Sequence, residues 1–435
     1  MKIAYVSAGA GGMLCGSCLH DNTLAAAIRR AGHDIVLIPT YTPLRTDEQD
    51  VSLPQVFYGA VNIYLQGRSR LFRHTPRVLD RWLDHPALLR WVSRRADTTS
   101  AADLGELTLS VLRGEEGGQA KELHRLSAWL CSEFRPGIVH LTNSMFLGMA
   151  ATLKRDLGVP VVCSVQGEDL FLERLEDPWR ARVVEQLRAR AADADAFIAT
   201  SRDYADRMSE LLRVRDGRMH VVPLGLSLAG FPDQHAAGDA SPGSFTIGYM
   251  ARICPEKGFH LLAEAFNLLA QRPGGQHVRL RAAGYLGPGD TPWYEQVRRR
   301  IEAWGLGDRF EYLGEIDRGS KMAFFESIDV MSVPTIYREA KGLSILESLA
   351  CGVPVVQPAH GAFPEMLERT GGGLLFAPGS APALADALEQ LMRDPARRVD
   401  LGRAGRARVR ELYSDDVMAR ETLKVYLAAT GGSGS

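Results

Sequence analysis

Short apolar runs alternate with amphipathic stretches from one end of the chain to the other. Such runs fit strands that are buried on both faces, and the stretches between them fit helices that cover a sheet. One helix is expected to begin at Lys257, with apolar residues on a single face at Phe259, Leu262, Phe266 and Leu269. The alternation is typical of parallel sheets in an α/β fold.

Two sets of strands follow from this pattern, separated by a polar stretch at 234–244. The predicted strands are 3–7, 34–39, 138–141, 160–165, 197–200 and 220–224 in the first set, and 245–251, 278–283, 310–313, 330–334, 354–357 and 373–376 in the second. Each set predicts a doubly wound, Rossmann-like domain, and the carboxyl ends of the strands of both domains should face a central cleft.

The chain has 435 residues, which is more than one ordinary core accommodates, so two domains are expected. The predicted domains are 1–228 and 229–413, followed by a final helix over 414–430. Residues 431–435 read Gly-Gly-Ser-Gly-Ser, have the composition of a linker, and are left out of the predicted fold.

Composition and charge exclude several classes of protein. Hydrophobic residues make up 46% and charged residues 24%, which is typical of a soluble globular protein. With 51 basic and 52 acidic side chains, no overall field favours a nucleic-acid partner. Six cysteines in so long a chain do not predict a disulfide framework. No signal peptide or membrane-spanning apolar run is apparent, so a cytoplasmic location is expected.

The strongest local candidate for chemistry is the segment 339–347. Gly342 lets the backbone approach a ligand, and the amides of residues 343–345 begin a helix without partners inside it. Unpaired donors at the positive end of a helix dipole suit a phosphate. A plainer alternative stays open, because Ser344 and Glu347 have the spacing of a capping box.

A second candidate follows the strand 245–251. Arg252 and Lys257 lie in a turn between a strand and a helix, and both can point at one polyanion. The planar guanidinium and the compact ammonium together suit a diphosphate that is losing its sugar. In the alternative, this is a solvated turn in which Lys257 pairs with Glu256.

The first strand leads into a glycine-rich loop at 9–12. The loop is close to a dinucleotide-binding fingerprint, but Leu14 stands where the third glycine should be. No acidic residue closes the next strand, so the ribose clamp of a dinucleotide site is missing. Gly11 and Gly12 are therefore predicted to approach another ligand or the opposite domain.

Further motifs share the order and spacing of these candidates. They are Ala31-Gly32-His33-Asp34, Val222-Pro223-Leu224-Gly225, Lys257-Gly258, Glu339-x7-Glu347, Gly-Val-Pro-Val-Val at 352–356 and Gly361-Ala362-Phe363-Pro364-Glu365. As an ordered set the motifs resemble the retaining GT-B glycosyltransferases of glycosyltransferase family 4. The resemblance covers nearly the whole chain.

That resemblance implies a different binding function for each domain. The first domain would bind the acceptor, the second would bind a nucleotide-sugar donor such as a UDP- or GDP-sugar, and the terminal helix would return to the first domain. The acceptor would be a carbohydrate, a lipid-linked sugar or a small molecule with a free hydroxyl. A hexosyl group would move with retention of anomeric configuration, and preorganised donors would do this without a cofactor or metal.

The resemblance also implies residue roles. Arg252 and Lys257 would hold the donor diphosphate, Glu339 would touch hydroxyls of the donor sugar, and Glu347 would bond the ribose. The backbone of Gly342, Leu343 and Ser344 would complete the phosphate seat, and Gly11 and Gly12 are assigned to donor binding as well.

One position departs from the family pattern. Where many relatives have a histidine, this chain has Gln166, which can hydrogen-bond a sugar but cannot take a proton. We still include Gln166 among the catalytic candidates. The neighbouring Glu168 and Asp169 are predicted to orient the acceptor, with a charge pair at a helix start as the open alternative.

Two short motifs are assigned structural roles. Asp193 and Asp195 form a D-x-D, but they lie between a helix and a strand, where acids are ordinary, so no metal site is predicted. Cys15 and Cys18 have redox-motif spacing without a thioredoxin-like context or a second pair for zinc, so they are interpreted as small residues near a ligand.

The segment 68–95 carries eight arginines interleaved with leucines and aromatic residues. A basic, aromatic helical segment could contact an anionic membrane at its inner face. An ordinary helical pair with a solvated arginine face is the open alternative.

Two other classes of function stay open at this point. One is a GT-B-fold epimerase or phosphorylase, and a phosphorylase would need a lysine for pyridoxal phosphate. The other is a non-catalytic protein that binds sugar nucleotides.

Overall fold

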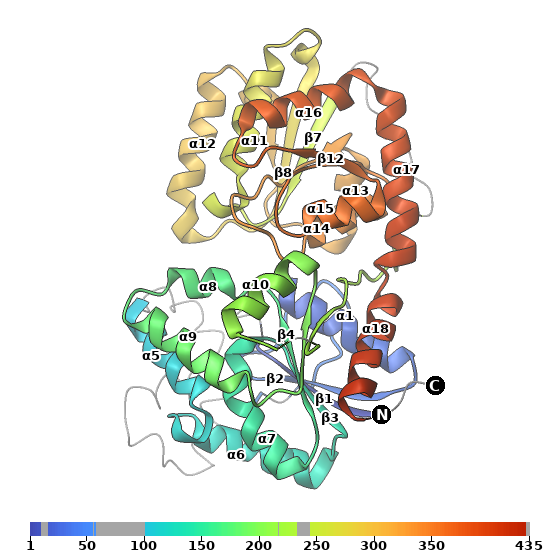
Figure 1. Ribbon diagram of the computed structural model, residues 1–435. Helices are drawn as coiled ribbons and strands as arrows, with labels where there is room; N and C mark the ends of the chain where they lie inside the picture. The colour runs from blue at the N-terminus through green and yellow to red at the C-terminus, as the bar shows by residue number, and fades with distance from the viewer. Residues whose placement is uncertain (10–15, 55, 58–100, 216, 233–243, 432–435) are drawn as a thin grey trace. The chain divides into compact units, whose positions relative to one another are not determined.

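The computed structural model describes the chain except residues 10–15, 55, 58–100, 216, 233–243 and 432–435 (Figure 1). The chain divides into two compact units. The first comprises Met1–Gly225 with Asp415–Ser435, and the second comprises Leu226–Ser414. The sequence placed these divisions after residues 228 and 413, three residues later and one residue earlier than in the structure.

The first unit contains a parallel sheet in the order β2-β1-β3-β4-β5-β6. Its strands are β1 (Lys2–Ser7), β2 (Asp34–Pro39), β3 (Ile138–Leu141), β4 (Val161–Val165), β5 (Ala196–Ala199) and β6 (Met219–Val221). All six predicted strands of this half are confirmed. Every residue of β3, β4 and β5 is buried, as expected of strands covered on both faces.

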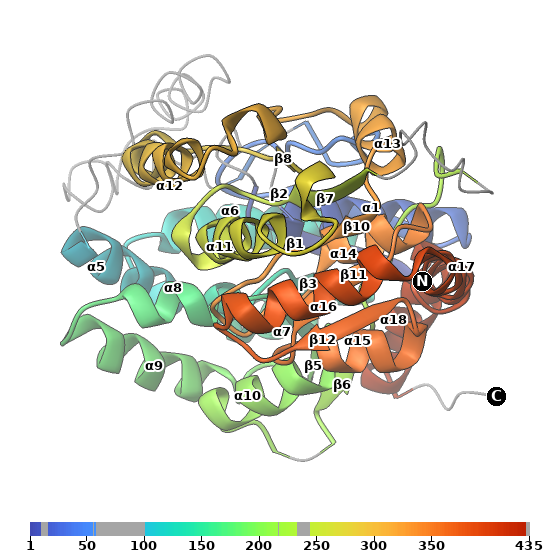
Figure 2. The same cartoon turned by 90° about the horizontal axis from the view of Figure 1, so that it is seen from above.

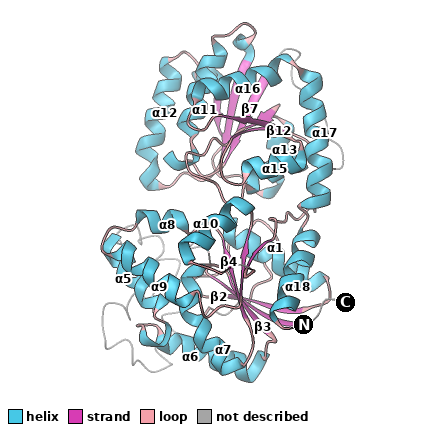
Figure 3. Ribbon diagram, viewed as in Figure 1, coloured by secondary structure: helices cyan, strands magenta, loops and turns pink. Residues whose placement is uncertain are grey.

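Helices flank this sheet on both sides (Figure 3). They are α1 (Gly16–Arg30), α5 (Ala101–Leu112), α6 (Ala120–Trp129), α7 (Ala150–Leu157), α8 (Asp169–Arg174), α9 (Trp179–Arg190), α10 (Arg202–Leu212) and α18 (Asp415–Ala429), with short helical turns at Gly114–Glu116, Leu130–Phe134 and Ser144–Met149. Local chemistry sets their ends. The Ser201 side chain accepts from the Tyr204 amide and starts α10, and Gly158 with φ 67° ends α7.

The terminal helix α18 belongs to the first unit. It packs on α1, and its Met418 and Tyr426 are 1% and 0% exposed within the same apolar core as Ile3 and Ile28. Burying side chains of this size stabilises the unit by about 1.5–3 kcal/mol each. Arg30 of α1 adds contacts to Asp415 at 2.6 Å and to Asp416 at 3.0 Å.

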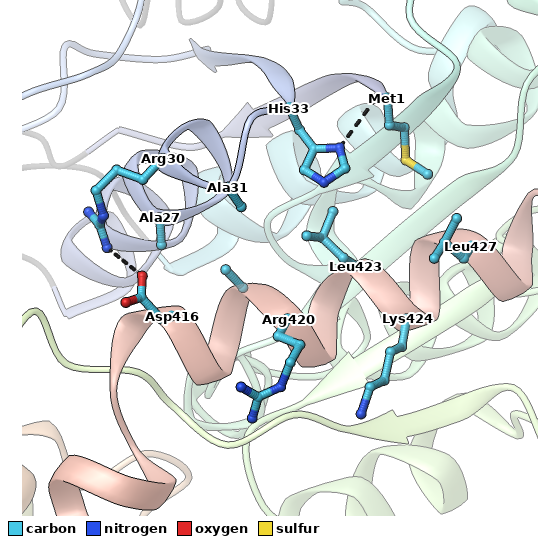
Figure 4. A pocket seen from close by; sticks show the side chains of 11 residues that line it. Met1, Ala27, Arg30, Ala31, His33, Asp416, Arg420, Leu423, Lys424 and Leu427 are labelled. Atoms are coloured by element: carbon cyan, nitrogen blue, oxygen red, sulfur yellow. Dashed lines mark hydrogen bonds and ion pairs between the residues drawn. The ribbon is translucent and has the colours of Figure 1, made fainter. Parts of the chain in front are cut away.

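A hollow of about 610 Å³ lies between α1 and α18, and Figure 4 shows its lining. Met1, just before β1, and His33, just before β2, both line it, and the Met1 amine is 3.2 Å from His33 Nδ1. The hollow therefore lies where the strands begin. Ligands of doubly wound sheets bind at the opposite edge, where the strands end.

The second unit contains another parallel sheet, in the order β12-β11-β10-β7-β8-β9. Its strands are β7 (Phe245–Met250), β8 (Val278–Ala283), β9 (Phe310–Tyr312), β10 (Val330–Met331), β11 (Val355–Pro358) and β12 (Gly373–Phe376). All six predicted strands of this half are confirmed too. The chain runs outward from β7 to β9 and then crosses back to β10, so the strand order reverses between β7 and β10.

Helices again cover both faces, and α11 and α16 lie side by side (Figure 2). The helices are α11 (Phe259–Ala270), α12 (Thr291–Ala303), α13 (Arg318–Glu326), α14 (Leu343–Ala350), α15 (Phe363–Thr370), α16 (Ala381–Arg393) and α17 (Pro395–Leu412), with short turns at Pro255–Lys257, Gly275–His277, Pro288–Asp290 and Gly307–Arg309. The expected start at Lys257 was wrong, because Gly258 with φ 74° ends a short turn there and α11 begins at Phe259.

Within the described part of the chain, no helix combines the length and the apolar character needed to cross a bilayer.

Candidate functional site

Two loops of the second unit meet where the strand order reverses. The loop after β7 carries Arg252 and Lys257, and the loop after β10 carries Glu339. At Gly258 a Cβ atom would collide with the carbonyl oxygen of Pro334, so only glycine lets the first loop press against the second. This reversal is where doubly wound sheets bind ligands.

Lys257 and Glu339 form an ion pair at this point. The Lys257 ammonium donates to Glu339 Oε2 at 2.6 Å and to the Tyr337 hydroxyl at 2.6 Å. The Tyr337 hydroxyl in turn donates to Glu339 Oε2 at 2.7 Å, and the ammonium lies 5.1 Å from the centre of the Tyr337 ring. The three side chains therefore form one closed polar cluster.

The Glu339 carboxylate is held in its ionised form. Burial by itself raises the pKa of Glu339, but the charge and hydrogen bond of Lys257 oppose this, and the Tyr337 hydroxyl and the Lys341 amide also donate to the carboxylate. Together they lower the pKa of Glu339 to about 2. The Ala362 amide donates to the Glu339 carbonyl at 2.8 Å, which fixes this backbone from the loop after β11.

Arg252 lies beside this cluster with 43% of its side chain exposed. Its Nε donates to Cys254 Sγ at 3.3 Å, and its guanidinium is 3.9 Å from Glu256. The alternative in which Lys257 pairs with Glu256 is therefore wrong, since Arg252 is the cation near Glu256. Arg252 remains accessible for a polyanion next to Lys257.

The start of α14 is open on one side. Gly342 with φ 69° precedes the helix, and no side chain caps it. Among the described residues, the amides of Leu343 and Ser344 have no hydrogen-bond partner. The Ile345 amide was expected to be open as well, but it donates to the Gly342 carbonyl at 3.1 Å. Two open amides at a positive helix end remain suited to an anion.

Glu347 does not close a capping box with Ser344. Its carboxylate accepts from Lys321 of α13 at 2.7 Å, and the side chains of Lys321 and Glu347 are 13% and 5% exposed. Glu347 therefore lies in a buried ion pair one turn into α14. The ribose contact assigned to it stays a prediction.

In the first unit, one buried carboxylate accepts hydrogen bonds from residues at the ends of three strands. Asp21 of α1 accepts from residues at the exits of β1, β3 and β4: Ser7 at 2.7 Å, Thr142 at 2.6 Å and Gln166 at 2.9 Å. The Tyr5 hydroxyl donates to it at 2.6 Å. Burial raises the pKa of Asp21, but the His20 contact, followed by the Thr142 and Tyr5 hydroxyls, lowers it to about 2.

Gln166 points its amide nitrogen into this network. Besides Asp21, that nitrogen donates to the Thr142 carbonyl at 2.8 Å, and the Gln166 side chain is 7% exposed. A sugar contact through this nitrogen would require these bonds to break. The catalytic role assigned to Gln166 stays a prediction, and a positioning role for the strand ends is the simpler interpretation of the geometry.

Glu168 and Asp169 also have partners inside the unit. Glu168 accepts from the Ser144 amide at 3.0 Å and the Ser144 hydroxyl at 2.7 Å, which ties the exit of β4 to the exit of β3. Asp169 pairs with Arg207, and the Tyr204 hydroxyl lies between the two carboxylates, 3.2 and 3.0 Å away. Both acids are 8% exposed.

Two family models match the chain. Residues 22–225 match the glycosyl transferase 4-like domain, and residues 231–408 match glycosyl transferases group 1. The chain belongs to the group 1 glycosyltransferases.

Curated relatives of this group 1 glycosyltransferase have related names. The D-inositol 3-phosphate glycosyltransferase of Pseudarthrobacter chlorophenolicus is 32% identical over 261 residues, which are 58% of this chain and 61% of that protein. The phosphatidyl-myo-inositol mannosyltransferase of Mycobacterium leprae is 37% identical over 140 residues, 32% of this chain and 37% of that protein. The chain thus spans less than two thirds of the length of these relatives.

Solved structures show the fold of the group 1 glycosyltransferase. The sucrose-phosphate synthase of Thermosynechococcus elongatus matches with a TM-score of 0.72 and 20% identity, covering 100% of both chains. HepE of Anabaena in complex with UDP matches with a TM-score of 0.68 and 17% identity, covering 98% of this chain and 100% of that one. The predicted GT-B fold, with two Rossmann-like parallel sheets, is confirmed.

Asp193 and Asp195, the two acids of the D-x-D motif, bind neighbouring groups of the first unit. Asp195 accepts from the Val161 amide at 2.8 Å and pairs with Lys154, and Asp193 lies 3.7 Å from Arg190. Within the described residues there is no group of three potential metal ligands. Four predictions concern positions outside the described residues: Gly11, Gly12, Cys15 and the segment 68–95. Cys18, the second cysteine of the motif, is buried in α1.

Sequence reasoning missed Tyr337 and Asp21. Tyr337 precedes Glu339 by two residues in a loop at a strand exit, so its position was a usable signal. Asp21 lies on the buried face of α1, where an acid needs polar partners, and that requirement could have marked it. Lys321, the partner of Glu347, has no comparable signal because it comes from a different helix.

Proposed function

We propose that this protein is a retaining glycosyltransferase that moves a hexosyl group from a nucleoside-diphosphate sugar to a hydroxyl acceptor without a metal. One observation carries the proposal. Lys257 and Glu339 meet at 2.6 Å where the strand order of the second unit reverses, beside the open amides that begin α14. A cation and backbone donors at one strand edge can bind the diphosphate of a sugar nucleotide, and an anion beside them can bind its sugar.

In the proposed reaction, Lys257 and Arg252 bind the donor diphosphate together with the amides of Leu343 and Ser344. Negative charge grows on the diphosphate as the bond to the sugar breaks. Donors that are already in place stabilise that charge in the transition state more than in the ground state, which is how they accelerate the reaction. The ionised Glu339 accepts hydrogen bonds from sugar hydroxyls and fixes the orientation of the ring.

The proposed acceptor side is the strand edge of the first unit. There Asp21, Gln166 and Glu168 hold the exits of β1, β3 and β4 in fixed positions. A rigid edge of this kind orients an acceptor hydroxyl, and orientation is a large part of the rate in transfer reactions. Retention of configuration at the anomeric carbon is part of the proposal.

The relatives support the choice of substrates. HepE of Anabaena has been solved in complex with UDP-glucose, and the Pseudarthrobacter relative is named for a sugar transfer involving an inositol phosphate. We therefore propose a nucleotide-sugar donor and a polyhydroxylated acceptor. Nucleotide sugars are cytoplasmic metabolites, so we place the protein in the cytoplasm, and we assign a contact with anionic lipid to the segment 68–95.

Thermal unfolding with nucleotides tests the donor. UDP, GDP and ADP and their glucose and mannose derivatives are added to the full chain at rising concentration. A ligand present at one hundred times its Kd stabilises the folded state by about 2.7 kcal/mol and raises Tm. Nucleotides with one of the three bases are expected to raise Tm, and the absence of a Tm shift with all of them would remove the proposal.

Proton NMR of the glycoside product tests retention, because it gives the anomeric configuration of the product. An inverted product would contradict retention.

A further inference from the structure

We propose that the Lys257–Glu339 pair makes the site select an intact sugar nucleotide over the free nucleoside diphosphate that the reaction releases. This inference rests on the proposed function, because it concerns the same donor site. It assigns a specificity role to a contact between two site residues and gives Tyr337 a part in it.

The Lys257 ammonium has two protein partners in the site. It bonds Glu339 and Tyr337 at 2.6 Å each, and the Lys257 side chain is 24% exposed. A diphosphate that approaches Lys257 meets an ammonium whose charge is already compensated by a carboxylate. The diphosphate therefore has to compete with Glu339 for this cation.

Glu339 loses its positively charged partner once Lys257 turns toward the diphosphate. The side chain of Glu339 is 12% exposed, and an ionised carboxylate at such a site is costly without donors. Tyr337 and the Lys341 amide, 2.7 and 3.3 Å away, still donate to it. They keep the carboxylate ionised but do not replace the lost positive charge.

The two ligands differ in the groups that they bring to Glu339. A sugar nucleotide brings sugar hydroxyls, which can donate to Glu339 in place of the ammonium. A free nucleoside diphosphate brings no donor to this position, so the Glu339 carboxylate is left without a replacement for the Lys257 charge. The ion pair therefore weakens the binding of the product, the free diphosphate, more than the binding of the sugar nucleotide. This difference favours release of the product after transfer.

The test uses calorimetric titration of the full chain with UDP, GDP and ADP and with their glucose derivatives. In Glu339→Gln the competing charge is removed, and the free diphosphate of the accepted base is expected to bind about fivefold tighter. The affinity for the matching sugar nucleotide is expected to rise less, because the sugar hydroxyls lose their charged hydrogen-bond acceptor. The ratio of the two affinities therefore moves toward the free diphosphate.

Glu256→Gln is the matched control. It removes the same charge from the neighbouring turn, 3.9 Å from the Arg252 guanidinium, and leaves the Lys257–Glu339 pair intact. This variant is expected to keep the wild-type ratio. An equal change of ratio in Glu256→Gln would mean that any lost negative charge acts this way, and would overturn the inference.

A double-mutant cycle with Lys257→Met tests whether the effect acts through the lysine. In that background Glu339→Gln is expected to leave the affinity for the free diphosphate unchanged. An undiminished gain would show that Glu339 repels the diphosphate directly. If Glu339→Gln does not fold, as judged by circular dichroism, Glu339→Asp serves instead, because its shorter side chain weakens the pair and predicts the same direction.

The outcomes separate this inference from the proposed function. If no nucleoside diphosphate or its sugar binds the wild-type chain, the proposed function fails and this inference fails with it. If the nucleotides bind and Glu339→Gln does not tighten the free diphosphate, the inference alone fails.

Discussion

The Gln166 amide nitrogen donates to Asp21 at 2.9 Å, across 145 residues of sequence. Gln166 follows β4, and Asp21 lies on α1, which packs beside β1 and β2. The bond thus links the end of β4 to α1, the helix that follows β1. Four neighbouring side chains donate to the Asp21 carboxylate within 2.9 Å, so this carboxylate connects the exits of β1, β3 and β4.

Asp21→Asn is expected to destabilise the first unit. The new amide nitrogen would face hydroxyls that now donate to a carboxylate, so at least one buried donor loses its partner. The expected loss is about 2–3 kcal/mol in the free energy of unfolding, measured by urea denaturation. Asp34→Asn is the control, because that side chain is 57% exposed and 3.7 Å from Lys2, and it should change stability little. Equal losses in the two variants would contradict the role of Asp21.

His140 predicts a dependence of stability on pH. Burial lowers the pKa of His140 from 6.5 to about 3, and its ring lies between the Tyr426 hydroxyl at 2.6 Å and the Ser164 hydroxyl at 2.8 Å. Between these pH values the unfolded chain binds a proton on this histidine and the folded chain does not. The free energy of unfolding should therefore fall as pH drops below about 6.5, down to about pH 3.

Urea denaturation at several pH values checks this slope. His140→Gln keeps a donor and an acceptor at the position without a group that titrates in this range. The variant is expected to be less stable at pH 7 and to lose part of the slope between pH 6 and pH 4. An unchanged slope in the variant would assign the pH dependence to other groups.

Lys257→Ala is expected to lower transfer from the nucleotide sugar by about 100-fold or more. The reason is the loss of a preorganised positive charge at the diphosphate, a loss that typically costs that much in the chemical step. Initial rates of donor consumption with acceptor present give the value. Lys424→Ala on α18 removes a lysine that is 65% exposed and pairs only weakly with Glu421, so its rate should match the wild type.

Glu168→Gln is expected to impair use of the acceptor more than binding of the donor. The carboxylate ties Ser144 to the exit of β4, and an amide there keeps the shape but weakens the bonds to the Ser144 and Gln166 amides. Acceptor KM should rise while the Kd for the donor stays within about twofold, since the side chains assigned to the diphosphate and the sugar belong to the other unit. Unchanged acceptor kinetics would remove the acceptor role.

The inner strands β3, β4, β5, β7 and β11 could be predicted because each is a fully buried apolar run, and burial on both faces leaves a strong local pattern. The site positions Arg252, Lys257 and Glu339 could be predicted too, since they follow strands at a carboxyl edge. Which of these three residues contact one another could not be predicted. Lys257 and Glu339 lie 82 residues apart and meet only because β10 returns to pair with β7.

The other differences have two causes, one local and one distant. The Ile345 amide was expected to be open, but its bond to the Gly342 carbonyl depends on the tight first turn of α14. The capping box between Ser344 and Glu347 gave way to a bond with Lys321, because burial favours a charged partner over a backbone amide. Partners supplied by distant elements leave no mark in the local sequence.

A crystal structure with the accepted nucleotide sugar tests the central claim most directly. The account predicts the diphosphate within hydrogen-bond distance of Lys257, Arg252 and the amides of Leu343 and Ser344, with sugar hydroxyls on Glu339. A diphosphate bound away from the reversal between β7 and β10 would contradict it.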